Sequence, residues 1–265
     1  MPGFATTSDQ VNLAFDLVEG TGPYVVCLHA MMTDGRYFGA LRDNGFAPSL
    51  GCNVFVSDFR GHGRSTPPVA GKDDWSFDDL VEKDLPALAA GKDAIIGHSL
   101  GGLVALAGIA TGTIAPPKRL VLVATNVWLG GGFQRTAIMA AYRGVTALFG
   151  KAPIKALHVG TADESKTYVA QLTGWQRTGR WTSLAGVDYM AALETIDVPT
   201  LVVAGAGDWM CTPDDAAGIA RRLRNAQMRI VGTKYGDPID PDHFQLFTRP
   251  ELAALRGELA RFVTS

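Results

Sequence analysis

The sequence predicts a doubly wound α/β fold, in which helices cover both faces of a mostly parallel sheet. Three observations support this prediction. The apolar runs along the chain are nearly continuous in Val, Ile and Leu, as in strands that are buried on both faces. Segments with helical patterning lie between most of these runs. The chain of 265 residues, with 47% hydrophobic and 19% charged residues, is long enough to bury the core of one large domain.

The strands and helices follow from these patterns in chain order. Val11–Glu19 alternates apolar and polar residues, which indicates an antiparallel strand at the start of the sheet. The continuous apolar runs predict buried strands at Tyr24–Leu28, Asn53–Ser57, Ala94–Gly97, Arg119–Ala124, Thr200–Ala204 and Gln227–Val231. Helices are predicted at Phe77–Ala90, Ser99–Thr111, Thr212–Arg224 and Pro250–Val263.

One segment interrupts the alternation of strand and helix. Between the strands that end at Ala124 and begin at Thr200, the chain has no strand pattern and is rich in helix formers and aromatic residues. A structureless loop of this length is uncommon in a compact domain. We therefore expect residues 126–195 to form a helical lid, inserted into a core of residues 1–125 and 196–265. Gly130–Gly132 is a candidate hinge for this lid.

Composition argues against several classes of protein. The net charge of −2 and the lack of a basic run disfavour nucleic acid as a partner. The N-terminal residues lack the pattern of a signal peptide, and no apolar segment approaches the roughly 20 residues that span a bilayer. Three widely spaced cysteines do not suggest disulfides. We expect a cytoplasmic protein with no membrane contact, and the sequence leaves its oligomeric state open.

The segment Gly97–Gly101 carries the strongest chemical pattern. It reads Gly-His-Ser-Leu-Gly and follows a predicted buried strand directly. A serine between two glycines, where a strand turns into a helix, suits a nucleophile exposed on a sharp turn. The glycines remove β-carbons that would collide where the chain reverses. Because the chain contains 31 glycines, this pattern needs support from its context.

The ends of other predicted strands supply that context. In open α/β sheets, active sites lie beyond the carboxyl ends of the strands. Ser99, Asp208 and His243 follow three different predicted strands, in that chain order. A serine, an acid and a histidine brought together in this way are what a serine hydrolase requires.

With these residues in place, the chain resembles the α/β-hydrolase superfamily, and within it the lidded esterases and related hydrolases. The stretches that carry the resemblance are Leu28–Met31, Asp58–Ser65, Gly97–Gly102, Gly205–Asp208, and Asp242-His243 followed by Arg249–Glu251. The resemblance covers almost the whole chain. It implies an eight-stranded, mostly parallel sheet with an inserted helical lid.

The resemblance assigns the catalytic roles to Ser99, His243 and Asp208. Ser99 is the expected nucleophile, and its weakly nucleophilic hydroxyl needs His243 as an adjacent base. Asp208 is expected to hold the tautomer of the imidazole and to stabilise its cation. A helix-capping serine, a surface histidine and a turn aspartate are the plainer alternatives. Asp58 is a rival acid, whereas Asn126, where some relatives carry the acid, supplies no charge.

The other four histidines have weaker claims to the role of base. His98 lies inside the glycine turn and is expected to point away from Ser99. His29 and His62 are expected to hold loops through hydrogen bonds. His158 falls in the predicted lid, where we expect it to be solvated.

The backbone N–H groups of Met31 and Leu100 are the expected oxyanion hole. Next to Met31 the chain departs from the family, because Ala30 stands where the family usually has glycine. Trp128, Trp209 and Met210 are candidate substrate-binding residues, and the aromatic lid suggests an apolar or aromatic substrate.

These residues predict hydrolysis of an ester, a thioester or a lactone through an acyl-serine intermediate. The same machinery also suits a carbon–carbon bond hydrolase, a perhydrolase, an acyltransferase or a hydroxynitrile-type lyase, and a ligand receptor on a hydrolase scaffold remains an alternative. Ser99 excludes the family's dehalogenases and epoxide hydrolases, which attack with aspartate. No zinc spacing, phosphate-binding glycine loop or dinucleotide fingerprint is present, so no metal and no cofactor are expected.

Overall fold

The computed structural model of the chain describes residues 1–39, 44–69 and 73–265. Within these residues eight strands form one sheet in the order β1-β2-β4-β3-β5-β6-β9-β10. Its strands are β1 (Pro2–Thr6), β2 (Asn12–Val18), β3 (Tyr24–Leu28), β4 (Asn53–Ser57), β5 (Ala94–His98), β6 (Arg119–Val123), β9 (Thr200–Gly205) and β10 (Ala226–Val231). β2 pairs antiparallel with both β1 and β4, and the pairs from β4 to β10 are parallel. The predicted fold class is confirmed.

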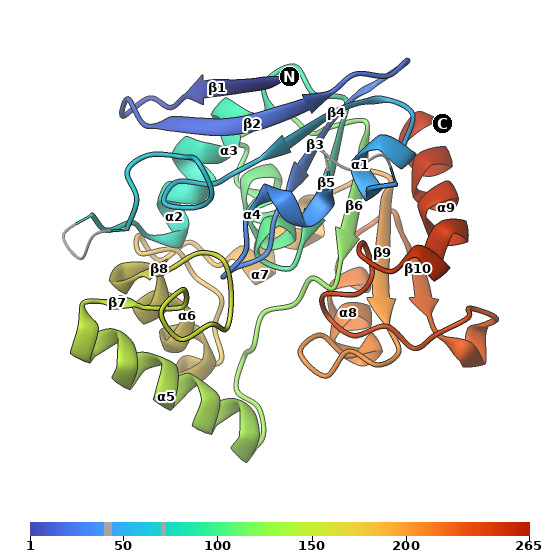
Figure 1. Cartoon of the computed structure of the whole chain (residues 1–265). Helices are drawn as coiled ribbons and strands as arrows, with labels where there is room; N and C mark the ends of the chain where they lie inside the picture. The colour runs from blue at the N-terminus through green and yellow to red at the C-terminus, as the bar shows by residue number, and fades with distance from the viewer. Residues whose placement is uncertain (40–43, 70–72) are drawn as a thin grey trace.

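Helices cover both faces of this sheet, as Figure 1 shows. The core contains η1 (Gly35–Phe38), α1 (Phe46–Ser49), α2 (Phe77–Asp79), η2 (Leu80–Asp84), α3 (Leu85–Ala89), α4 (Leu100–Ala110), α8 (Pro213–Ala220), η4 (Thr233–Tyr235), η5 (Pro250–Leu252) and α9 (Ala253–Thr264). On one face α9 packs against α1 and β6, and on the other α4 packs against α3 and β5. None of the described helices is both long and apolar enough to cross a membrane.

Three elements differ from the sequence-based expectation. β1 was not predicted, because its side chains are mostly exposed and it is held by backbone pairing with β2 at the sheet edge. The helix predicted at Phe77–Ala90 contains a π turn, in which Leu85 N–H bonds to the carbonyl of Leu80. Pro86 follows this turn and lacks an N–H, so a regular α-helical ladder is interrupted there in any case. α8 ends at Ala220, earlier than predicted.

The segment between β6 and β9 is largely helical. It contains α5 (Phe133–Phe149), β7 (Lys151–Ala152), β8 (Glu164–Ser165), α6 (Lys166–Thr178), α7 (Tyr189–Ala192) and η3 (Leu193–Thr195). We refer to α5, β7, β8 and α6 with their connections as the insert. β7 and β8, which form a short antiparallel pair, were not predicted, because the sequence shows no strand pattern in this segment. Figure 1 shows the insert at the end of the sheet toward which β6 and β9 point.

Candidate active site

Ser99 occupies a strained turn between β5 and α4. Its φ is 50° and its ψ is −110°, a backbone region that a residue with a β-carbon rarely adopts. Two hydrogen bonds hold the strained residue: Ser99 N–H donates to Val123 O at 2.9 Å, and Ser99 O accepts from Leu103 N at 3.1 Å. Such strain persists where the surrounding structure determines it, and it occurs often at functional sites.

Gly97 and Gly101 make this turn possible, because backbone atoms of other residues lie where their β-carbons would be. A β-carbon on Gly97 would lie 2.5 Å from the α-carbon of Gly102, on the far side of the turn. A β-carbon on Gly101 would lie 2.2 Å from the carbonyl oxygen of Leu28 in β3. Both distances are far below a normal carbon contact, so the Gly-x-Ser-x-Gly pattern has a steric reason in this structure.

Asp208 and His243 form a buried hydrogen-bonded pair, although 35 residues separate them. Asp208 follows β9, and its Oδ2 accepts from His243 Nδ1 at 2.8 Å. Its Oδ1 accepts from the backbone N–H groups of Met210 and Cys211, both at 2.8 Å. Both carboxylate oxygens are therefore occupied, and the side chain is fixed with its charge beside Nδ1. This leaves Nε2 of His243 unprotonated when the ring is neutral.

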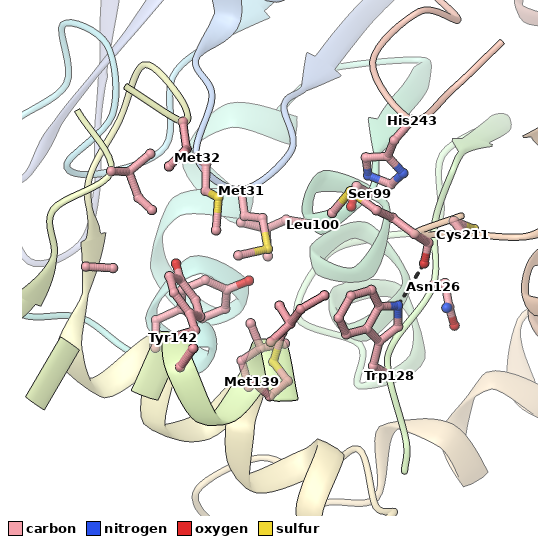
Figure 2. A pocket seen from close by; sticks show the side chains of 18 of the residues that line it. Met31, Met32, Ser99, Leu100, Asn126, Trp128, Met139, Tyr142, Cys211 and His243 are labelled. Carbon is pink, nitrogen blue, oxygen red and sulfur yellow. Dashed lines mark hydrogen bonds between the residues drawn. The ribbon is translucent and has the colours of Figure 1, made fainter. Parts of the chain in front are cut away.

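Ser99 and His243 line the same cavity, and Figure 2 shows them beside each other. No hydrogen bond joins the Ser99 hydroxyl to the imidazole among the described residues. Catalytic hydrogen bonds are often long in ligand-free enzymes and shorten when substrate binds. The structure thus brings together the serine and histidine that the sequence predicted, with the aspartate behind the histidine.

The two predicted oxyanion donors also line this cavity. Leu100 is the first residue of α4, where backbone N–H groups have no intrahelical acceptor. Met31 lies in the loop after β3. Neither N–H donates a hydrogen bond to any described residue, so both remain free for a ligand oxygen. Ala30, in place of the family's glycine, is buried with a negative φ and fits without strain.

The cavity has a volume of about 370 Å³ and lies between the sheet edge and the insert. Most of its lining is apolar, and the insert supplies Ile138, Met139, Tyr142, Ile154 and Leu172. Asn126 stands where some relatives carry the catalytic acid. In this structure it contributes a polar group to the lining. Its Nδ2 has no partner in the described part of the chain. Its position after β6 was the one signal that marked it in the sequence.

The three predicted substrate-binding residues lie together on this lining. Trp128 is buried, and its Nε1–H donates to the carbonyl of Met210 at 2.7 Å. The Trp209 ring lies 6.1 Å from that of Trp128, centroid to centroid, and half of Trp209 is exposed. Met210 is partly buried beside them.

Two further histidines, His98 and His29, make hydrogen bonds to backbone groups, a role that the sequence analysis expected for His29. Nε2–H of His98 donates to the carbonyl of His243 at 2.9 Å, and its ring stacks on Tyr37. Burial, and then the neighbouring His243, lower the pKa of His98 well below its usual range. His29 donates through Nδ1–H to Ala30 O at 2.8 Å and accepts from a loop N–H at Nε2. Burial, and then His62, lower the pKa of His29 to about 3.

Asp58, the rival acid, is engaged elsewhere. Its two oxygens accept backbone N–H groups from Gly35 at 2.7 Å and Arg64 at 3.0 Å. It therefore fixes the loop after β4, and in the described part of the chain its side chain does not bond to a histidine. His158 is exposed, as expected. Across the described ranges, no group of three or more His, Cys, Asp or Glu side chains is arranged to hold a metal ion.

This sheet order, with a strained serine turn and an inserted helical segment, defines the class of α/β-fold hydrolases. The chain belongs to the alpha/beta hydrolase family, whose model matches residues 25–254. No curated protein matches the sequence.

Solved structures agree with this assignment. A hydrolase from Pseudomonas aeruginosa is 24% identical, with a TM-score of 0.66, over 100% of this chain and 98% of that one. A thermophilic esterase from Thermogutta terrifontis is 19% identical, with a TM-score of 0.69, over 100% of both chains. An enol-lactonase from Burkholderia xenovorans is 19% identical, with a TM-score of 0.67, over 99% of this chain and 100% of that one. These identities show the fold alone, and with the family they support a hydrolase.

Proposed function

We propose that the protein is a serine hydrolase that cleaves a carboxylic ester, thioester or lactone through an acyl-serine intermediate. The observation that carries the proposal is the fixed Asp208–His243 pair, which lies at the cavity that also exposes the strained Ser99. In this mechanism Nε2 of His243 takes the hydroxyl proton as Ser99 attacks the carbonyl carbon. His243 then protonates the leaving alcohol and activates the water that releases the acid. Asp208 stabilises the imidazolium throughout.

The negative charge that develops on the carbonyl oxygen is bound by two N–H groups in this proposal. Leu100 and Met31 supply them, and each donor contributes about 2.7–4 kcal/mol to transition-state stabilisation. The dipole of α4, whose first residue is Leu100, favours the same charge.

The cavity supports a small, apolar or aromatic substrate. Its apolar lining stabilises a bound hydrocarbon group through burial, whereas a charged group there would lose its hydration without compensation. Trp128, Trp209 and Met210 would contact the substrate beside Asp208. We also propose that residues 126–195 act as a lid over this cavity, since the insert forms much of its wall.

A fluorophosphonate probe tests the nucleophile. We expect wild-type protein to be labelled and to hydrolyse esters, and Ser99→Ala to do neither. Ser8→Ala, a change at an exposed serine outside the cavity, is the matched control and should behave as wild type. Labelling of Ser99→Ala, or ester turnover below about one per hour on a broad ester panel, would contradict the proposal.

The substrate class is tested with aryl esters, lactones and esters of increasing acyl length. We expect activity to peak at acyl groups that fill the 370 Å³ cavity and to fall for charged acyl groups. Product analysis separates ester cleavage, which releases an acid and an alcohol, from carbon–carbon bond cleavage of a diketone, which would release an acid and a ketone.

A further inference from the structure

Glu164 is a fully buried carboxylate that the mechanism above does not use. It begins β8 in the insert, and its Oε1 accepts hydrogen bonds from Met32 N–H and from Nε2 of His62, the latter at 3.2 Å. Its Oε2 has no partner within the described residues. A buried carboxylate is costly unless it is paired. The contacts at Oε1 therefore fix where Glu164 lies.

Met32 has a strained backbone that the insert holds from both sides. Its φ is 61°, in the left-handed region that residues with a β-carbon seldom occupy. Its N–H donates to Glu164, and its carbonyl accepts from Thr161 N at 2.8 Å and Ala162 N at 3.2 Å. The approach is close, since a β-carbon on Gly160 would lie 2.4 Å from this carbonyl oxygen. The insert thus determines the conformation of the loop after β3.

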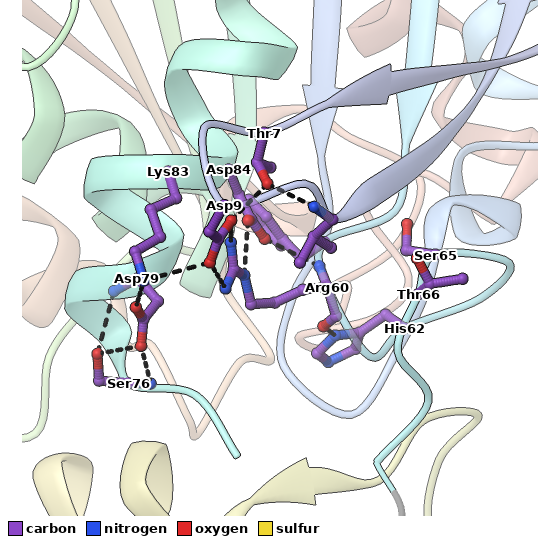
Figure 3. Close-up of polar contacts among 12 residues, drawn as sticks. Thr7, Asp9, Arg60, His62, Ser65, Thr66, Ser76, Asp79, Lys83 and Asp84 are labelled. Carbon is purple, nitrogen blue, oxygen red and sulfur yellow. Dashed lines mark hydrogen bonds and ion pairs between the residues drawn. The ribbon is translucent and has the colours of Figure 1, made fainter. Parts of the chain in front are cut away.

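His62 contacts Glu164 through Nε2 and is itself held by a backbone carbonyl at Nδ1. Its Nδ1 faces the carbonyl of Arg60 at 2.8 Å and its Nε2 faces Glu164, so both ring nitrogens donate when the ring is protonated. Burial opposes that charge, but the carboxylate of Glu164 and the carbonyl of Arg60 outweigh it and raise the pKa of His62. Arg60 is fixed in turn by ion pairs to Asp84 at 2.7 Å and Asp9 at 3.0 Å (Figure 3).

We propose that Glu164 is a positioning residue for the oxyanion donor Met31. By accepting from Met32 N–H, it holds the peptide between Met31 and Met32, so that the N–H of Met31 points into the cavity. The peptide between Ala30 and Met31 is held as well, because its carbonyl, Ala30 O, accepts from Thr33 Oγ1 at 2.8 Å. Since a peptide's N–H and carbonyl point in opposite directions, a fixed Ala30 carbonyl directs the Met31 N–H the other way. The inference rests on the proposed function and makes the insert part of the oxyanion hole's support.

Kinetics of Glu164 variants test this role. In Glu164→Ala we expect kcat to fall about 10- to 100-fold with KM changed less than about threefold, because a misplaced donor weakens transition-state binding more than substrate binding. Glu164→Gln keeps an oxygen that can accept from Met32 N–H and should recover most of kcat. The matched control is Asp163→Asn, whose carboxylate bonds to Lys151 and to Lys155 N–H and not to Met32. It should keep the wild-type kcat.

Amide hydrogen exchange of residues 29–33 gives a readout that does not need activity. We expect faster exchange there in Glu164→Ala and unchanged exchange in Asp163→Asn. Wild-type kcat or wild-type exchange in Glu164→Ala would overturn the inference, and so would an equal loss of kcat in Asp163→Asn. If only the Glu164 results fail while Ser99-dependent hydrolysis is present, the proposed function stands. If Ser99-dependent hydrolysis is absent, the proposed function fails, and the exchange measurement alone decides whether Glu164 positions the loop.

Discussion

Replacing Asp208 with asparagine changes one atom of the carboxylate and tests the role of the buried pair. Oδ1 of Asp208 accepts from two backbone N–H groups, those of Met210 and Cys211, whereas among the described residues Oδ2 accepts only from His243. The carbonyl oxygen of the asparagine will therefore occupy the Oδ1 position, where two donors require an acceptor. Its NH₂ group is then directed at Nδ1 of His243.

An NH₂ group at that position forces the wrong tautomer on the imidazole. Nδ1 must accept, so the single proton of the neutral ring moves to Nε2, which then cannot take the proton of Ser99. We expect kcat to fall by about 10⁴, as in other serine triads that lose their acid in this way. This corresponds to about 5.5 kcal/mol at 1.36 kcal/mol per tenfold change in rate.

Steady-state hydrolysis of an aryl ester measures this loss, and thermal unfolding shows whether the fold survives. Since both backbone hydrogen bonds are kept, the unfolding midpoint should change little. Asp58→Asn is the matched control: it loses one of two backbone hydrogen bonds and should lower stability while the folded protein keeps its kcat. Near-normal activity in Asp208→Asn together with an inactive, folded Asp58→Asn would refute the assignment of the acid.

Three further predictions concern stability. Arg60→Met leaves the carboxylate of Asp84 buried without its partner and should cost about 3–5 kcal/mol in urea unfolding, most of it recovered when Asp84 is also made apolar. Gly101→Ala places a methyl group 2.2 Å from a carbonyl oxygen of β3 and should lower the yield of folded protein sharply, as circular dichroism will show. The free energy of unfolding should fall as pH rises through the raised pKa of His62, because protonated His62 stabilises the fold only below it. Glu164→Gln should flatten this dependence, and a wild-type stability that rises over the same interval would contradict the assignment.

The sequence predicted the sheet core because burial on both faces leaves a local pattern. Strands β3, β4, β5, β6, β9 and β10 are continuous apolar runs, and their residues are the ones that parallel neighbours and covering helices bury. β1 left no such pattern, since its side chains are largely exposed and its stability comes from backbone pairing. The two-residue strands β7 and β8 are too short to show any periodicity.

The site was partly predictable for a related reason. Ser99, Asp208 and His243 follow predicted strands, and the carboxyl ends of parallel strands meet at one edge of a sheet. Seven of the eight residues named from the sequence line the cavity, and Asp208 lies behind His243. Glu164 was not predicted, because it is an acidic residue in a helix-rich segment that has no local feature of an active site.

By itself the sequence determined the order of the strands along the chain, the glycine-flanked serine and the chemistry available at the strand ends, because these depend on neighbours in the chain. Only the tertiary structure decided which distant groups meet. The Glu164–Met32 hydrogen bond joins residues 132 positions apart, and the Asp208–His243 bond depends on two loops that follow different strands. The positive φ of Met32 and the apolar cavity arise from packing of the insert against the sheet edge, which no local pattern specifies.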